Sequence, residues 1–200
     1  MKKVNAPTDL VFYKVGEGEL LREKALLAVN ITTNEIAGVG DEAEAISGSS
    51  ENIMLISPFH FGSIGNYTYA KKLIDILLQK AFGKHNIVSY LQKPVYTVCF
   101  DDVFLNTDNE SYELLSEVNK KVYQDIFFQT GAKKVELFDG SAEKYLSVTD
   151  KKILSRITGI IEVTNDDKDD YAIELIKETI DKLKKMGYSK QDVCDIIKEL

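Results

Sequence analysis

Residues Gly16 to Ile46 read "GEGELLREKALLAVNITTNEIAGVGDEAEAI", and this stretch decides the predicted fold. Turn residues in "GEG" (16–18) and "TTNE" (32–35) separate short runs of strand-forming residues. Turn residues between such runs are typical of β-hairpins. With "DLVFYKV" (9–15) in front of it, the stretch predicts that the first third of the chain is rich in strands.

A helix is predicted after a further strand at residues 53–59. The segment "NYTYAKKLIDILLQKAF" (66–82) places its apolar residues on one helical face. Asn66 is a favourable N-cap residue, and Gly83 provides a stop. Before this unit, "DEAEAISGSSEN" (41–52) predicts only a brief helical or loop link.

A strand–helix–strand unit is predicted next. "KPVYTVCFDD" (93–102) has the apolar run of a buried strand, and residues 107–131 have the periodicity of a long amphipathic helix that ends at Gly131. "AKKVELFDG" (132–140) is the following strand, and "SAEKYLS" (141–147) is long enough for about one turn of helix. This order is typical of a parallel crossover. The fold class is therefore α/β.

The last fifty or so residues differ in pattern. Residues 151–165 predict a strand or mixed structure, residues 166–187 an amphipathic helix, and residues 189–200 a short helix capped by Ser189. The domain organisation that we predict has a lobe at residues 9–146. A C-terminal extension at residues 147–200, a strand followed by the amphipathic helical tail, packs on that lobe.

Composition restricts the partners and the compartment. The chain of 200 residues has a net charge of −7, and its lysines are interleaved with acids, which argues against a nucleic-acid partner or an anionic membrane surface. Its two cysteines, Cys99 and Cys194, form no metal or disulfide motif, and Cys99 is predicted to be a buried core thiol. A signal peptide and a transmembrane run are not recognisable, which predicts a cytoplasmic protein.

Motifs for chemistry are sparse. "NDDKDD" (165–170) lacks the ligand spacing of a calcium loop, and His60 and His85 have no partner at metal-ligand spacing. The sequence contains no GxxxxGK[ST], GxGxxG or GxSxG motif. We therefore assign no catalytic, nucleotide-binding or metal-binding residue and expect no cofactor.

Three stretches resemble, in order, the MreB family of bacterial actin-like rod-shape proteins. They are "LVFYKVGEGELLREKALLAVNITTNEIAGVGDEAEAI" (10–46), "NIMLISPFHFGSIGNYTYAKKLIDILLQKAF" (52–82), and "KPVYTVCFDD" (93–102) followed by a helix and "TGAKKVELFDGSAEKYL" (130–146). The resemblance covers residues 9–146. It implies the first lobe of an actin-like ATPase fold, a ribonuclease-H-like mixed sheet with flanking helices and with the early hairpins at one edge.

The chain departs from the family where the chemistry is expected. Only "MKKVNAPTD" precedes "LVFY", so the family's first phosphate loop, "IDLGT", is expected to be missing or unrecognisable. The family's acidic "EEP" corresponds to Asp139, Gly140 and Ser141, which leaves one carboxylate at Asp139. The second loop, "DIGGGTT", has no counterpart. Without these loops ATP hydrolysis lacks its phosphate cradle.

Two functions from different classes follow. The first is a non-catalytic actin-like module, a pseudo-ATPase that binds a protein partner or a second copy of itself and is linked to bacterial cell shape and the cytoskeleton. The second is a Mg²⁺-dependent ribonuclease-H-like enzyme or a residual ATP binder. In that alternative Asp101, Asp102 and Asp139, all at predicted strand ends, would converge on one site.

Overall fold

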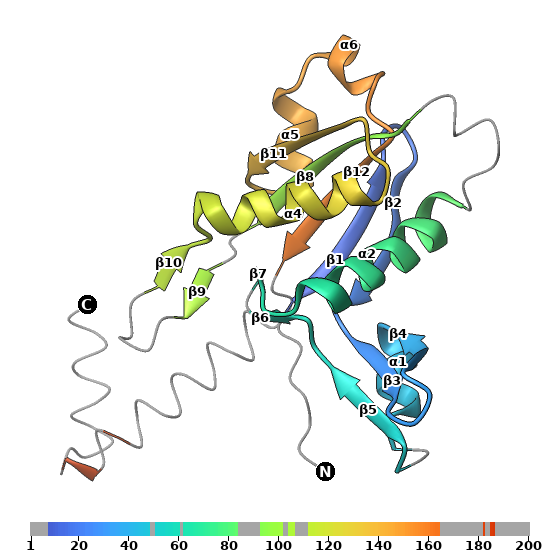
Figure 1. The fold of residues 1–200 in the computed structure, drawn as a ribbon. Coiled ribbons are helices and arrows are strands. Elements are labelled where there is room, and N and C mark those ends of the chain that lie inside the picture. Colours follow the sequence, from blue (N-terminus) through green and yellow to red (C-terminus); the bar gives the residue numbers. More distant parts are fainter. Residues whose placement is uncertain are drawn as a thin grey trace. The chain divides into compact units, whose positions relative to one another are not determined.

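The protein is described from a computed structural model (Figure 1). The structure describes residues 8–48, 51–60, 62–83, 93–101, 104–106, 112–164, 182, 185 and 186. The chain divides into two compact units, Met1–Asp166 and Asp167–Leu200. All elements named below belong to the first unit. The predicted helices at residues 166–187 and 189–200, and the cap Ser189, lie outside the described residues apart from three positions.

A five-stranded mixed sheet forms the centre of the first unit, in the order β11-β8-β12-β1-β2. The strands are β1 (Asp9–Lys14), β2 (Gly18–Lys24), β8 (Val95–Asp101), β11 (Lys134–Asp139) and β12 (Gly159–Thr164). β11 and β12 both run parallel to β8, whereas β1 runs antiparallel to β12 and to β2. The predicted parallel strand–helix–strand unit and the first hairpin are confirmed.

β12 is the middle strand of this sheet, and all of its residues are buried. It pairs with β1 on one side and with β8 on the other. It therefore joins the first hairpin to the β8–β11 pair. The strand predicted within residues 151–165 lies inside the sheet, and the compact unit that contains it runs through Asp166.

The second hairpin forms a sheet of its own. β3 (Leu27–Asn30), β4 (Glu35–Val39) and β5 (Ile53–Ile56) make a three-stranded antiparallel sheet in the order β4-β3-β5. The prediction that all early hairpins lie at one edge of the main sheet was therefore wrong for this hairpin. Consecutive residues of β3 are buried on both faces, so the strand needs cover on each side. Helix α1 (Asp41–Ile46) covers one face through Ala43, and the other face joins the main core.

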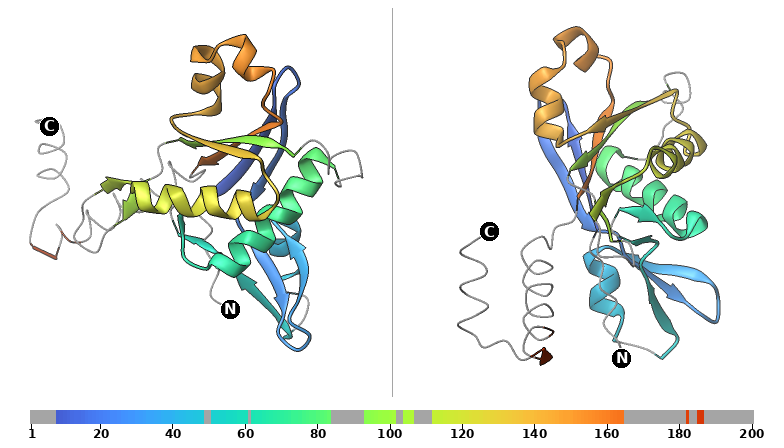
Figure 2. Two further views of the ribbon diagram at one scale, coloured as in Figure 1. Left: turned by 45° about the horizontal axis from the view of Figure 1, so that its top comes forward. Right: turned by 90° about the vertical axis from the view of Figure 1, so that its left-hand side faces the viewer.

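Helices cover both faces of the main sheet (Figure 2). α2 (Tyr67–Phe82) and α4 (Glu117–Gln129) contribute to the large core on one face, and α5 (Ala142–Val148) packs on the other, followed by α6 (Lys151–Leu154). The predicted ends of α2 are confirmed. The Asn66 side chain accepts a hydrogen bond from the Tyr69 N–H at 3.2 Å, and Gly83 ends the helix with φ 83°.

α4 begins later than predicted. The Ser116 hydroxyl oxygen accepts a hydrogen bond from the Asn119 N–H at 3.2 Å, and its extended backbone starts the helix at Glu117 rather than near residue 107. β10 (Tyr112–Leu114) precedes it and pairs with β9 (Phe104–Asn106). The end is as predicted, because Gly131 follows the helix with φ 100°. A further short hairpin, β6 (Phe59–His60) and β7 (Ser63–Ile64), leads into α2.

Aromatic rings fill the core between α2, α4 and the sheet. The Phe82 ring lies 6.2 Å from the Phe12 ring and 5.8 Å from the Tyr96 ring, measured between centroids. It also covers Gly159 at the start of β12, where a Cβ atom would stand 2.2 Å from the Phe82 Cζ atom. Cys99 is fully buried on the opposite face, as predicted, and burial raises the pKa of its thiol.

Candidate functional site

The carboxyl ends of β8, β11 and β12 meet at one edge of the main sheet. β8 continues into α4 on one face and β11 into α5 on the other. Ligands of α/β proteins bind where such connections diverge, so this edge is the candidate site. It contains Asp101 and Asp139, two of the three strand-end acids singled out from the sequence.

A buried lysine holds Asp139. The Lys120 ammonium of α4 lies 2.6 Å from Asp139 Oδ1 and 2.9 Å from Glu117 Oε1. Its side chain is 8% exposed, whereas those of its two partners are 71% and 75% exposed. It also lies 6.0 Å from the centroid of the Phe100 ring. Burial lowers the pKa of Lys120, but the hydrogen bonds to Asp139 and Glu117 outweigh burial and raise it. The ammonium therefore stays charged and occupied by Asp139.

Asp101 lies on the opposite face of the sheet from Asp139. Side chains alternate along a strand, so Asp101 shares the face of Cys99, which packs with Ala142 of α5. Asp139 instead contacts Lys120 on the α4 face. The two acids therefore do not converge, and this part of the sequence prediction was wrong. Asp102 lies outside the described residues, and so do His85 and residues 165–170; for His60 only the backbone is described.

Glu162 of β12 is the acid that does lie near Asp101, and sequence reasoning missed it. The side chain is buried, and it accepts hydrogen bonds from the Ala142 N–H and from the Tyr13 hydroxyl. Burial raises the pKa of Glu162, the Ala142 N–H opposes that shift, and the charge of Asp101 adds to it. Within the described ranges, no three His, Cys, Asp or Glu residues are grouped so as to hold a metal ion.

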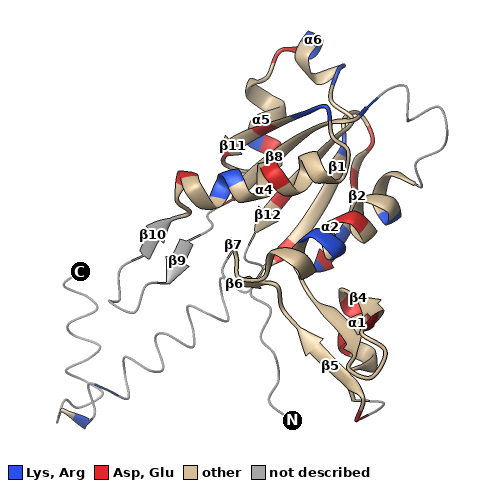
Figure 3. Cartoon of the chain, in the orientation of Figure 1, with Lys and Arg blue, Asp and Glu red and all other residues tan. Residues whose placement is uncertain are grey.

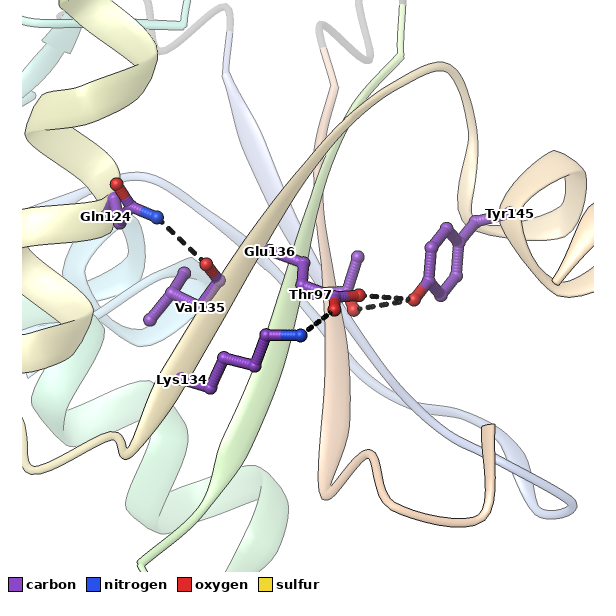
Figure 4. Close-up of polar contacts among 6 residues, drawn as sticks. All are labelled: Thr97, Gln124, Lys134, Val135, Glu136 and Tyr145. Atoms are coloured by element: carbon purple, nitrogen blue, oxygen red, sulfur yellow. Dashed lines mark hydrogen bonds and ion pairs between the residues drawn. The ribbon is translucent and has the colours of Figure 1, made fainter. Parts of the chain in front are cut away.

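A second polar cluster fixes α5 on the sheet (Figure 4). The Tyr145 hydroxyl donates to Glu136 Oε2 at 2.9 Å and accepts from the Thr97 hydroxyl at 3.2 Å. Lys134 pairs with Glu136 and lowers its pKa, burial opposes that effect, and the Tyr145 hydroxyl reinforces it. The cluster thus anchors the helix that follows the Asp139 turn. Its sequence signal was the Tyr145 position inside the predicted helical turn.

The outer edge of β11 is also closed. The Gln124 side-chain amide of α4 donates to the Val135 carbonyl at 2.9 Å (Figure 4). This contact satisfies a backbone acceptor at the last strand of the sheet, where an unpaired edge would otherwise be open to another strand.

Glu23 of β2 connects the small sheet to the lobe. Its Oε1 atom lies 3.0 Å from the Lys80 ammonium of α2, and its Oε2 atom accepts from the Asp41 N–H at 3.1 Å. Gly40 sits against this carboxylate with φ 61°, and a Cβ atom there would stand 1.7 Å from Oε2. Glu23 is therefore the shared contact of β2, α2 and the start of α1.

No helix in the described part of the chain is both long and apolar enough to span a membrane.

Comparison with known proteins gives consistent matches. The family model described as MreB/Mbl protein matches residues 6–144. The cell shape-determining protein Mbl of Bacillus cereus is 25% identical over 92 residues, which are 46% of this chain and 26% of that protein. The chain thus spans about a quarter of the length of this curated relative.

Solved structures give the same result for the fold. MreB 5 of Spiroplasma citri bound to AMPPNP has 19% identity and a TM-score of 0.50, with 67% of this chain and 36% of that chain covered. The ADP-bound MreB5 of the same organism has 17% identity and a TM-score of 0.48. The α/β fold class of an actin-like lobe is confirmed. β12 lies beyond the residues that the family model matches.

Proposed function

This chain belongs to the MreB/Mbl protein family, and we propose that it is a non-catalytic assembly module linked to bacterial cell shape. The similarity to a cell shape-determining Mbl protein supports the cellular role. The proposed partners are a second copy of the chain or another actin-like protein, and the proposed location is the cytoplasm.

The contact between Lys120 and Asp139 carries the non-catalytic part of this proposal. Asp139 corresponds to the acid at which the family positions water in the sequence comparison. A carboxylate bonded to a lysine ammonium at 2.6 Å is a weak acceptor for a further proton donor. With Asp101 on the opposite face, the described carboxylates offer no paired acids for phosphoryl transfer at this edge.

The test of the non-catalytic part is direct. Purified full-length chain is incubated with ATP and Mg²⁺, phosphate release is followed, and binding is measured by calorimetry. We expect neither heat nor phosphate. Turnover that Asp139→Asn abolishes, and that Glu143→Gln on the exposed side of α5 leaves intact, would overturn the proposal.

Assembly is tested by sedimentation velocity over a range of protein concentrations. We expect the mean sedimentation coefficient to rise with concentration, because association follows mass action. A chain that remains monomeric at every concentration and salt would refute self-assembly and leave a different protein as the partner.

A further inference from the structure

Acidic residues gather at one end of the first unit. Residues 25–70 contain no Lys or Arg, and their acids are Glu35, Asp41, Glu42, Glu44 and Glu51. Glu44 pairs with Lys24 at 2.6 Å. The other four are exposed, and they lie on β4, on α1 and just before β5. We call these four residues the acidic end.

Basic residues gather at the amino edge of the main sheet. This basic end consists of the exposed residues Lys93, Lys133, Lys151, Lys152 and Arg156. Backbone hydrogen bonds bring its segments together. The Lys133 N–H donates to the Pro94 carbonyl at 2.7 Å, and the Thr158 N–H donates to the Val95 carbonyl at 2.8 Å. Figure 3 shows basic residues on α6 and acids on the small sheet at the other end of the unit.

Neither end is neutralised by its own surroundings. Among the ion pairs formed by described residues, none uses a cation of the basic end or one of the four acids of the acidic end. The net charge of −7 disfavours association of copies in general, so a contact must bring opposite local charges together. The two ends supply such a pair.

Exposed apolar side chains accompany the charges at both ends. Val148 is 67% exposed and Ile153 is 46% exposed beside the lysines of α6. On the small sheet, Ile31 is 57% exposed and Met54 is 47% exposed. Apolar centres with charged rims are typical of protein–protein contacts. This combination favours a protein over a nucleic acid as the occupant of the basic end.

We propose that the basic end of one copy docks on the acidic end of a second copy. This inference rests on the proposed assembly function and names the surfaces that carry it. Because the two surfaces differ, the contact is heterologous, and each added copy leaves one basic end and one acidic end free. The association therefore grows stepwise with concentration instead of stopping at a closed dimer.

Charge reversal of each end, followed by mixing, tests the proposal in the full chain. Lys151→Glu/Lys152→Glu makes both ends acidic, and Glu35→Lys/Glu42→Lys makes both ends basic. We expect each variant alone to associate roughly tenfold more weakly than wild type at low salt, because like charges then face each other. An equimolar mixture should recover association, since the two variants complement each other. High salt should weaken the wild-type association.

Matched controls and distinct outcomes keep the test decisive. Lys121→Glu, on the exposed surface of α4, carries the same charge change as Lys152→Glu and should leave association unchanged. Circular dichroism checks that each variant is folded. If wild type associates but the mixture does not recover, the proposal is overturned while the assembly function stands. Loss through the basic end alone, with binding to anionic vesicles or nucleic acid instead, also overturns it.

Discussion

The packing of Phe82 on Gly159 predicts how strongly the sheet depends on a residue without a side chain. In Gly159→Ala the new Cβ atom would stand 2.2 Å from Phe82 Cζ, 2.7 Å from Cε1 and 2.9 Å from Cε2. The Phe82 ring must therefore shift, but it is held between the rings of Phe12 and Tyr96. Overpacking of this kind costs about 1–3 kcal/mol of unfolding free energy.

The loss of backbone freedom in the unfolded chain offsets part of this cost. Gly→Ala recovers about 0.4–1 kcal/mol where the native backbone permits it. We therefore expect Gly159→Ala to lower the unfolding free energy by about 1–2 kcal/mol. For a chain of this size, that corresponds to a fall in the melting temperature of roughly 2–8 °C.

Urea denaturation followed by circular dichroism measures the change. Gly48→Ala is the matched control, because a Cβ atom at Gly48 meets nothing within 4 Å. A double-mutant cycle with Phe82→Leu identifies the contact, since a smaller side chain should recover most of the loss caused by Gly159→Ala. Equal stability of Gly159→Ala and wild type, or purely additive effects in the cycle, would refute this account of the packing.

Three further changes test other contacts. Because burial raises the pKa of Glu162, the native state binds the extra proton, so stability is highest below the carboxyl's unfolded pKa and falls as pH rises through the folded one. Glu162→Gln should remove that fall and be more stable than wild type at pH 7 in urea titrations; a less stable variant would contradict this. Gly40→Ala should cost about 1–3 kcal/mol by calorimetry, because its φ is positive and its Cβ atom would overlap the Glu23 carboxylate. A chain that ends at residue 158 should lose dispersed amide signals in NMR spectra, whereas one that ends at Asp166 should keep them; folded spectra from both would show that β12 is dispensable.

Local sequence signals predicted the elements, but not all of their partners. Turn residues such as those at 16–18 mark chain reversals through backbone preferences that need no tertiary context, so the hairpins were predictable. The ends of α2 followed from Asn66 and Gly83 for the same reason. The start of α4 was misplaced because the apolar residues before Ser116 also fit a helical period.

Pairing and facing required the structure. The apolar run of β12 fits any buried strand, and nothing in its period specifies a place between β1 and β8. The alternation of Leu26–Val29 likewise shows burial without showing that a separate sheet is formed. The contact between Lys120 and Asp139 joins residues from different elements across a sheet face, and its register depends on how α4 packs.

The middle position of β12 also sets the order in which the lobe can be completed during synthesis. β1 and β2 emerge early, yet the strand that lies between β1 and β8 begins only at Gly159. At about 5–20 residues per second, the 135 residues from Lys24 to Gly159 take on the order of ten seconds to synthesise. Throughout that interval the inner edges of β1 and β8 have no partner in their native sheet. Contacts between residues so far apart along the chain slow folding, and open strand edges invite pairing with other chains. The nascent lobe is therefore a natural client for a chaperone until its last strand arrives.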